Sequence, residues 1–242
     1  VINNSWLCPP SEGCESDSDF GFMESAIQNL KDAGVVVVVS AGNSGSGCGS
    51  VESPAAFFQE SFTIGATDDN DEIASFSSRG PSTGYGSGVL KPNVSAPGVS
   101  VYSSEPGDDY GTHSGTSMAG PHVAGAVALL ISADPGLEGD VEAIEDILEL
   151  TAIPLTSDQT CGGVSGSSIP NNTYGYGRID ALAAVNYALG NVALEIVKFD
   201  GYNLDNKNKL EWEIENKENE IEFILEKSTD LSSWFRLARI DI

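Results

Sequence analysis

The sequence is poor in positive charge, and this scarcity excludes several classes of partner. Its 242 residues include 11 Lys and Arg against 36 Asp and Glu, which gives a formal net charge of −25. Nucleic acids and anionic membranes bind proteins through Lys and Arg, so a chain of this charge repels both. We therefore expect no nucleic-acid partner and no membrane partner, and we interpret the acidic surface as a solvated one.

Long apolar runs and Cys-x-x-Cys motifs are also lacking. The longest purely aliphatic run, Val35 to Val39, has five residues, whereas about 20 are needed to cross a bilayer as a helix. The sequence has four cysteines: Cys8, Cys14, Cys48 and Cys161. None of them forms a Cys-x-x-Cys pair, which argues against a zinc site.

The pattern of apolar residues predicts an α/β fold. Residues 1–6 read as a strand, and apolar residues recur at helical spacing from Phe22 to Leu30 before Gly34 ends that helix. Residues 35–40 form a β-branched run suited to a strand that is buried on both faces. Strand, helix and strand in this order indicate a parallel βαβ crossover.

A serine stands where a flexible turn meets an apolar helix. Gly115-Thr116-Ser117-Met118-Ala119 leads into Gly120-Pro121-His122-Val123-Ala124-Gly125 and a further apolar run. A hydroxyl at a helix N-terminus lies beside unpaired backbone N–H groups and the positive end of the helix dipole, which suits a nucleophile. The alternative is that Ser117 only caps the helix, because serine is a favoured N-cap residue.

This string resembles the nucleophile signature of the subtilisin-like serine proteases, the subtilases. The resemblance extends from Val1 to about Leu189 and includes three further blocks, Ile73–Pro81, Lys91–Gly98 and Tyr174–Asp180. It implies a three-layer α/β fold with a mostly parallel central sheet. It also implies that Ser117 attacks a peptide carbonyl to form an acyl-enzyme.

Val39-Ser40-Ala41-Gly42-Asn43 follows the buried run and resembles the subtilase oxyanion segment. By itself, Gly-Asn is ordinary turn chemistry. The resemblance implies that the Asn43 amide and the Ser117 N–H stabilise the tetrahedral intermediate.

Substrate-binding residues follow from the same resemblance. Ser5-Trp6-Leu7 matches one wall of the pocket for the residue on the acyl side of the scissile bond (the S1 pocket), and Ala41-Gly42-Asn43 matches the other. Thr116 stands beside the nucleophile. Leu7 departs from the family, where glycine is common, so the preferred side chain stays open, with small or medium apolar residues favoured.

The general base and the orienting acid of a serine triad are not evident. His122 lies five residues beyond Ser117 on the same helix and points about 140° away from it, and His113 lies in the preceding hairpin. We interpret both as structural. The Asp and His motifs of the family normally precede the segment that Val1 begins. We expect the chain to need that N-terminal part of the catalytic domain and to be inactive alone, the alternative being a non-catalytic scaffold or binding protein.

Resemblance to secreted enzymes implies disulfides and an extracellular location. The spacing of the four cysteines leaves three connectivities open, of which we favour Cys8–Cys14 with Cys48–Cys161. The chemistry requires no cofactor, structural calcium is possible, and metal ligands cannot be named from the sequence.

The character of the sequence changes after Leu189-Gly190. Four strand-like runs follow, at residues 192–199, 210–214, 221–228 and 234–240, with a turn or loop expected at 200–209. Leu210-Glu211-Trp212 and the segment Leu225–Asp230 resemble fibronectin-III-like modules. We expect a catalytic domain at residues 1–190 and a small antiparallel β module at residues 191–242, which would be a truncated sandwich because about 100 residues are usual.

Overall fold

The computed structural model describes residues 1–8, 20–51, 54–83 and 88–190, and the backbone of four strands beyond them. The chain divides into two compact units, Val1–Ala188 and Leu189–Ile242.

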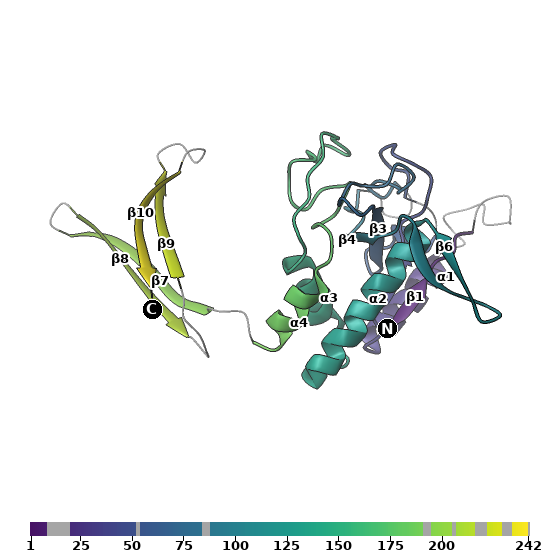
Figure 1. Ribbon diagram of the computed structural model, residues 1–242, viewed down its shortest axis with the longest axis horizontal. Coiled ribbons are helices and arrows are strands. Elements are labelled where there is room, and N and C mark those ends of the chain that lie inside the picture. Colours follow the sequence, from purple (N-terminus) through teal and green to yellow (C-terminus); the bar gives the residue numbers. More distant parts are fainter. Residues whose placement is uncertain are drawn as a thin grey trace. The chain divides into compact units, whose positions relative to one another are not determined.

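The first unit is built on a parallel sheet of four strands in the order β1-β2-β3-β4 (Figure 1). The strands are β1 (Ile2–Asn4), β2 (Val37–Ser40), β3 (Phe62–Thr67) and β4 (Val94–Pro97). Every residue of β2 and β3 is buried, as expected for strands that are covered on both faces. The predicted strands at residues 1–6 and 35–40 correspond to β1 and β2, and the short apolar segment Ser61–Gly65 corresponds to β3. Residues 91–98 were identified only as a block that resembles the family, and β4 lies within it.

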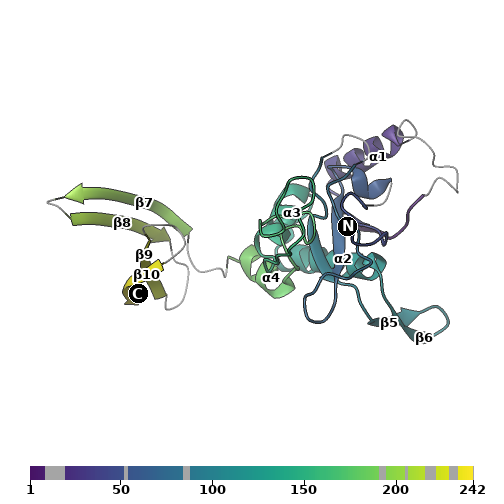
Figure 2. The same cartoon turned by 90° about the horizontal axis from the view of Figure 1, so that it is seen from above.

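Helices cover both faces of this sheet (Figure 2). Val37 and Val39 pack with Ile27 of α1 (Gly21–Asp32) on one face. Val36 and Val38 belong to the cluster on the opposite face, which is covered by α2 (Thr116–Ala133), α3 (Val141–Leu150) and α4 (Ala181–Ala188). Alternate residues of one strand therefore pack against different helix layers, and the predicted three-layer α/β fold is confirmed.

Shorter elements connect these layers. Two single turns of 3-10 helix, η3 (Ala55–Phe57) and η4 (Pro135–Leu137), precede β3 and α3. An antiparallel hairpin of β5 (Val101–Glu105) and β6 (Asp109–His113) leads into α2. This hairpin brings the chain from the end of β4 to the predicted nucleophile.

A disulfide joins Cys48 to Cys161 across 113 residues and confirms that half of the favoured pairing. The other half involves Cys14, which lies outside the described residues, so Cys8–Cys14 stays a prediction. The Arg79 guanidinium donates to the backbone oxygens of Ser77 and Ala74. It is 3% exposed, so the carbonyl groups of its own turn are the acceptors within reach.

The second unit contains four strands in two antiparallel pairs, β7 with β8 and β9 with β10. Their bounds are Glu195–Leu204, Lys207–Glu215, Glu222–Ser228 and Trp234–Asp241. The loop that we expected at residues 200–209 is mostly strand, because Tyr202 and Asn203 pair with Lys209 and Asn208. The fibronectin-III-like identity of residues 191–242 stays a prediction.

Candidate active site

Ser117 lies in the first turn of α2, directly after the hairpin. The Gly115 N–H donates to the Gly98 oxygen at 2.8 Å, which fixes the turn before the helix to the segment that follows β4. The first N–H groups of a helix have no intrahelical acceptor, and the Ser117 N–H is one of them. Ser117 is thus held where a developing negative charge meets backbone donors and the positive helix end.

Asn43 lies at the carboxyl end of β2 and contacts the start of α2 through its side chain. Its Oδ1 accepts hydrogen bonds from the Thr116 N–H at 2.9 Å and from the Thr116 hydroxyl at 3.1 Å. The Thr116 hydroxyl also accepts from the Gly42 N–H at 3.2 Å. These bonds fix the orientation of the Asn43 amide beside Ser117, although 73 residues separate Asn43 from Thr116.

Two further hydroxyl groups join β1 and β2 to the same turn. The Ser40 Oγ donates to the Thr116 carbonyl oxygen at 3.0 Å and lies 3.2 Å from the Ser5 Oγ. The Ser5 Oγ lies 3.3 Å from the Ser117 carbonyl oxygen. The carboxyl ends of two neighbouring parallel strands therefore meet the nucleophile turn at one edge of the sheet, where α/β sheets place their ligands.

These residues enclose a cavity of about 130 Å³ beside Ser117. Its walls are formed by Ser5, Trp6, Leu7, Ser40, Gly42, Asn43, Thr116 and Ser117. The structure thus brings together every residue that the sequence suggested for substrate binding, with one exception. Ala41 is completely buried and does not line the cavity. Ser40 lines the cavity in its place. Ser40 belongs to the segment that resembles the oxyanion segment, but it was assigned no role from the sequence.

A second cavity of about 370 Å³ opens on the hairpin side of Ser117. It is lined by Val101, Tyr102, Ser103, Ser104, His113, Ser117, Met118, Pro121 and His122. Sequence reasoning did not find this cavity, because its walls come from a hairpin whose position relative to α2 depends on tertiary packing. The two cavities share Ser117 and no other lining residue.

The two histidines line this second cavity, and each has a partner of its own. The His122 Nδ1–H donates to the Met118 oxygen one turn earlier at 2.9 Å. The His113 Nε2 forms an ion pair with Glu105 across the hairpin. Neither imidazole forms a hydrogen bond with the Ser117 Oγ within the described part of the chain. The described residues also contain no group of three or more His, Cys, Asp or Glu that could hold a metal ion.

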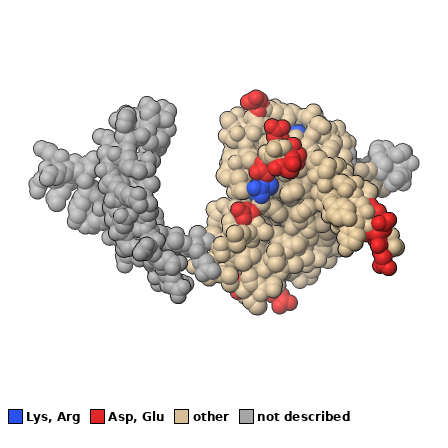
Figure 3. Space-filling view, in the orientation of Figure 1, with Lys and Arg blue, Asp and Glu red and all other residues tan. Residues whose placement is uncertain are grey.

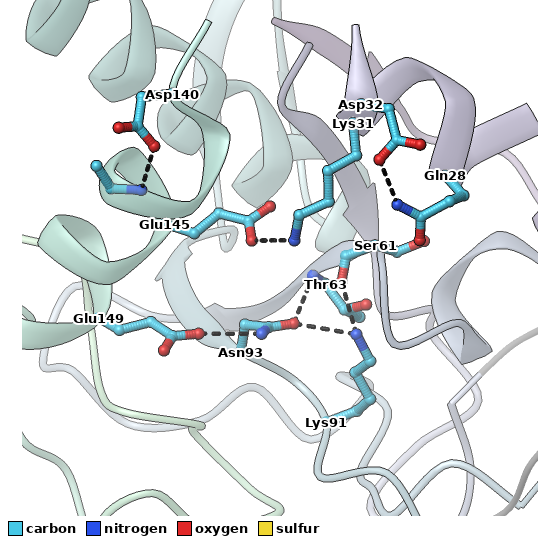
Figure 4. A network of polar contacts seen from close by, with 11 residues as sticks. Gln28, Lys31, Asp32, Ser61, Thr63, Lys91, Asn93, Asp140, Glu145 and Glu149 are labelled. Carbon is cyan, nitrogen blue, oxygen red and sulfur yellow. Dashed lines mark hydrogen bonds and ion pairs between the residues drawn. The ribbon is translucent and has the colours of Figure 1, made fainter. Parts of the chain in front are cut away.

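The strongest electrostatic feature lies away from Ser117, in a buried polar network (Figure 4). The Lys91 ammonium donates to the Ser61 oxygen at 2.6 Å and to Asn93 Oδ1 at 3.1 Å. Because this side chain is 1% exposed, desolvation lowers the pKa of Lys91 to about 7, against the pull of nearby carboxylates. Burial also raises the pKa of Glu145, which the Lys31 ammonium partly offsets from 2.6 Å. This network joins α1, α3 and β3 and includes none of the residues around Ser117.

Comparison with known proteins shows which proteins this chain resembles. The profile of the Subtilase family matches residues 1–177. Bacillopeptidase F of Bacillus subtilis (strain 168) is 42% identical over 198 residues, which cover 78% of this chain and 12% of that protein. Subtilisin Savinase of Lederbergia lenta is 38% identical over 169 residues, which cover 70% of this chain and 53% of that protein.

The comparison with solved structures also finds a protease domain. The self-cleaved protease domain of PatA is similar with a TM-score of 0.55 at 27% identity, covering 70% of this chain and 56% of that one. The chain spans about half the length of this structure and of Savinase, and much less of Bacillopeptidase F. The family profile matches most of the chain, and the matched segment contains both Ser117 and Asn43. The chain therefore belongs to the subtilase family.

Proposed function

We propose that this chain is the nucleophile-bearing part of a secreted serine endopeptidase that cleaves polypeptides through an acyl-enzyme. The observation that carries the proposal is the position of Asn43, whose amide is fixed by Thr116 on one wall of a cavity that Ser117 completes. A nucleophile, an oriented amide and a helix N-terminus around one cavity are the parts that acyl transfer requires.

The reaction proceeds in two steps. The Ser117 Oγ attacks the substrate carbonyl carbon as its proton passes to a base, and the carbonyl oxygen becomes an oxyanion. The Asn43 amide and the Ser117 N–H donate to that oxyanion. The intermediate then expels the protonated amine, and water hydrolyses the remaining ester to release the acid and restore Ser117.

The base and its orienting carboxylate come, in this proposal, from a polypeptide segment outside these 242 residues. The composition of helix α2 supports a further segment that covers it. Its 18 residues include no Asp, Glu, Lys or Arg. By length and composition alone it is apolar enough to cross a membrane, yet only 39% of it is buried. Leu129 is 54% exposed, and Gly125 and Ala128 are exposed beside it. A helix that is apolar on all sides is normally covered on all sides, so the uncovered face leading from Ser117 suits a further segment.

The cavity beside Asn43 is the S1 pocket in this scheme. Trp6 and Leu7, which are 48% and 43% exposed, form its rim, and its volume of about 130 Å³ suits a small or medium apolar side chain. The exterior is the proposed location, because disulfides persist in oxidising compartments and Cys48–Cys161 is formed.

Supplying the missing segment is the experiment that tests this function. The chain is expressed alone and together with the Asp- and His-containing part of its own catalytic domain, and peptide hydrolysis is measured. We expect turnover only from the combination, and none after Ser117→Ala. An inactive combination that nevertheless binds polypeptide would favour the non-catalytic scaffold.

A further inference from the structure

Ser117 lies between two peptide groups, and the carbonyl oxygens of both accept hydrogen bonds from serine side chains of the sheet. The first group contains the Thr116 carbonyl and the Ser117 N–H, which the proposed reaction uses as an oxyanion donor. A peptide group is planar, so a hydrogen bond that fixes its carbonyl oxygen also fixes the direction of its N–H. The second group contains the Ser117 carbonyl and the Met118 N–H.

The Thr116 carbonyl is held by Ser40, the last residue of β2. The Ser40 Oγ donates to the Thr116 oxygen at 3.0 Å, although 76 residues separate them. Ser40 is 8% exposed and follows the buried valines of its strand. A buried hydroxyl needs a hydrogen-bond acceptor, and the Thr116 oxygen is nearer than the Ser5 Oγ, which lies at 3.2 Å. The polar residue of this apolar strand thus holds the start of α2.

The Ser117 carbonyl lacks the hydrogen bond that a helix normally provides. In an α-helix this oxygen would accept from the N–H of the residue four positions later, which is Pro121, and proline has no N–H. The Ser5 hydroxyl, which follows β1, donates to the Ser117 oxygen at 3.3 Å. The Asn3 Nδ2 donates to the Ser5 Oγ at 3.0 Å and orients that hydroxyl. A side chain beside the sheet therefore replaces the missing helical bond.

A glycine allows α2 to lie this close to the two strands. Gly120 is buried, and a Cβ there would lie 2.6 Å from the Asn3 Oδ1 and 3.6 Å from the Ser40 Oγ. The first distance is well inside van der Waals contact, so a side chain at residue 120 would displace Asn3. The contact between the first turn of α2 and the sheet thus depends on this glycine.

We propose that Ser40 and Ser5 are positioning residues, whose hydroxyls fix the two peptide groups on either side of Ser117. Ser40 sets the direction of the Ser117 N–H. Its bond to the carbonyl of the same peptide group also strengthens this N–H as a donor, because linked hydrogen bonds polarise one another. Ser5 stabilises the turn at the carbonyl that Pro121 leaves without a donor. This role rests on the proposed function, in which the Ser117 N–H binds the oxyanion.

Removing either hydroxyl tests this role in the completed enzyme. Ser40→Ala and Ser5→Ala each remove a neutral group, so the acidic side chains that gather on the hairpin, on the right of Figure 3, are left as they are. We expect each variant to lower kcat about fivefold and to change KM less than about twofold. The reason is that a misdirected donor raises the energy of the transition state more than that of the bound substrate.

Ser61→Ala is the matched control, because it removes a similar hydroxyl at the opposite end of the parallel sheet. Ser61 directly precedes β3, whereas Ser40 ends β2. The Ser61 Oγ is also buried and donates to the Ala55 oxygen at 2.6 Å, but Ser61 lines neither cavity beside Ser117. We expect this variant to lose stability and to keep its kcat.

Pro121→Ala tests the role of Ser5 separately. Alanine supplies the N–H that proline lacks, so the Ser117 carbonyl can accept a bond within the helix. In this background we expect Ser5→Ala to lower kcat by about twofold or less, whereas Ser40→Ala keeps its full effect. A loss for Ser5→Ala that is the same with proline and with alanine at residue 121 would show that Ser5 does not hold this carbonyl.

The amide nitrogen resonance of Ser117, measured by NMR in the 242-residue chain, gives a readout that needs no activity. It responds to hydrogen bonding at the Thr116 carbonyl, so it should shift in Ser40→Ala and stay in place in Ser61→Ala. An unshifted resonance, or kcat values in both site variants equal to that of Ser61→Ala, would overturn the proposal. A shift together with an inactive unsubstituted combination would retain the bond from Ser40 to Thr116 and reject the proposed reaction.

Discussion

The side chain of Asn43 is held by Thr116, whose N–H and hydroxyl both donate to Asn43 Oδ1, at 2.9 and 3.1 Å. Thr116 precedes Ser117 in the chain, so one residue fixes the proposed oxyanion donor to the proposed nucleophile. The Gly42 N–H completes this connection by donating to the Thr116 hydroxyl. Preorganisation of this kind avoids reorientation of the donor during the reaction.

Asn43→Ala is predicted to slow the chemical step. In the completed enzyme we expect kcat to fall about 10²- to 10³-fold, as loss of such a donor does in subtilisin, with little change in KM. The donor acts on the transition state, so ground-state binding should not depend on it. Steady-state kinetics check this, and an effect confined to KM would assign Asn43 to substrate binding or to the turn.

Thr116→Val tests the connection between Asn43 and the helix. Valine keeps the shape but leaves the Gly42 N–H without its acceptor and removes one donor to Asn43. We expect a loss of about 1 to 3 kcal/mol in the free energy of unfolding and a lower kcat. Thr116→Ser retains the hydroxyl and serves as the control. Equal kcat values for the valine and serine variants would show that the hydroxyl does not position Asn43.

Lys91 should make the stability of the protein depend on pH between neutrality and about pH 10. Its pKa is lowered to about 7 from an ordinary value of 10.5. Between these values the unfolded chain binds a proton that the folded chain does not, so the free energy of unfolding rises with pH. The slope approaches about 1.4 kcal/mol per pH unit, and the full penalty is present below pH 7.

Urea unfolding at several pH values from 7.5 to 9.5 measures this slope. Lys91→Met removes the titrating group and should flatten the curve in that window, whatever its effect on stability at one pH. Glu138→Gln, which changes an exposed charge, should leave the slope unchanged. An unaltered slope in the methionine variant would show that Lys91 does not titrate in this range.

The Cys48–Cys161 disulfide should stabilise the folded chain substantially. It closes a loop across 113 residues, and loops of this length correspond to about 4 to 5 kcal/mol in the chain-entropy model. The double variant Cys48→Ser and Cys161→Ser should lower the unfolding free energy by up to this amount. Chemical unfolding of the two proteins under identical oxidising conditions measures the difference, and equal stability would contradict the prediction.

Much of the fold could be predicted because the spacing of apolar residues matched the strands and helices that the chain forms. The β-branched run Val35–Val39 predicted a buried strand, and the apolar residues after Ser117 predicted a helix. β4 was missed because Val94–Pro97 is short and contains a proline, so its strand character comes from pairing with β3.

In the candidate site, the sequence predicted only those residues that belong to a recognisable motif. Ser117 and Asn43 were found by motif, and the structure places them at one cavity. Ser40 and the hairpin cavity were not found, because their roles arise from the contact of β2 and β5 with one helix turn.

Chemical labelling shows directly whether Ser117 is the nucleophile. The completed enzyme and the isolated chain are treated with a fluorophosphonate, digested and mapped by mass spectrometry. We expect one adduct per molecule on Ser117 in the completed enzyme and none in the isolated chain. A different labelled serine, or undiminished peptide hydrolysis by Ser117→Ala, would contradict it.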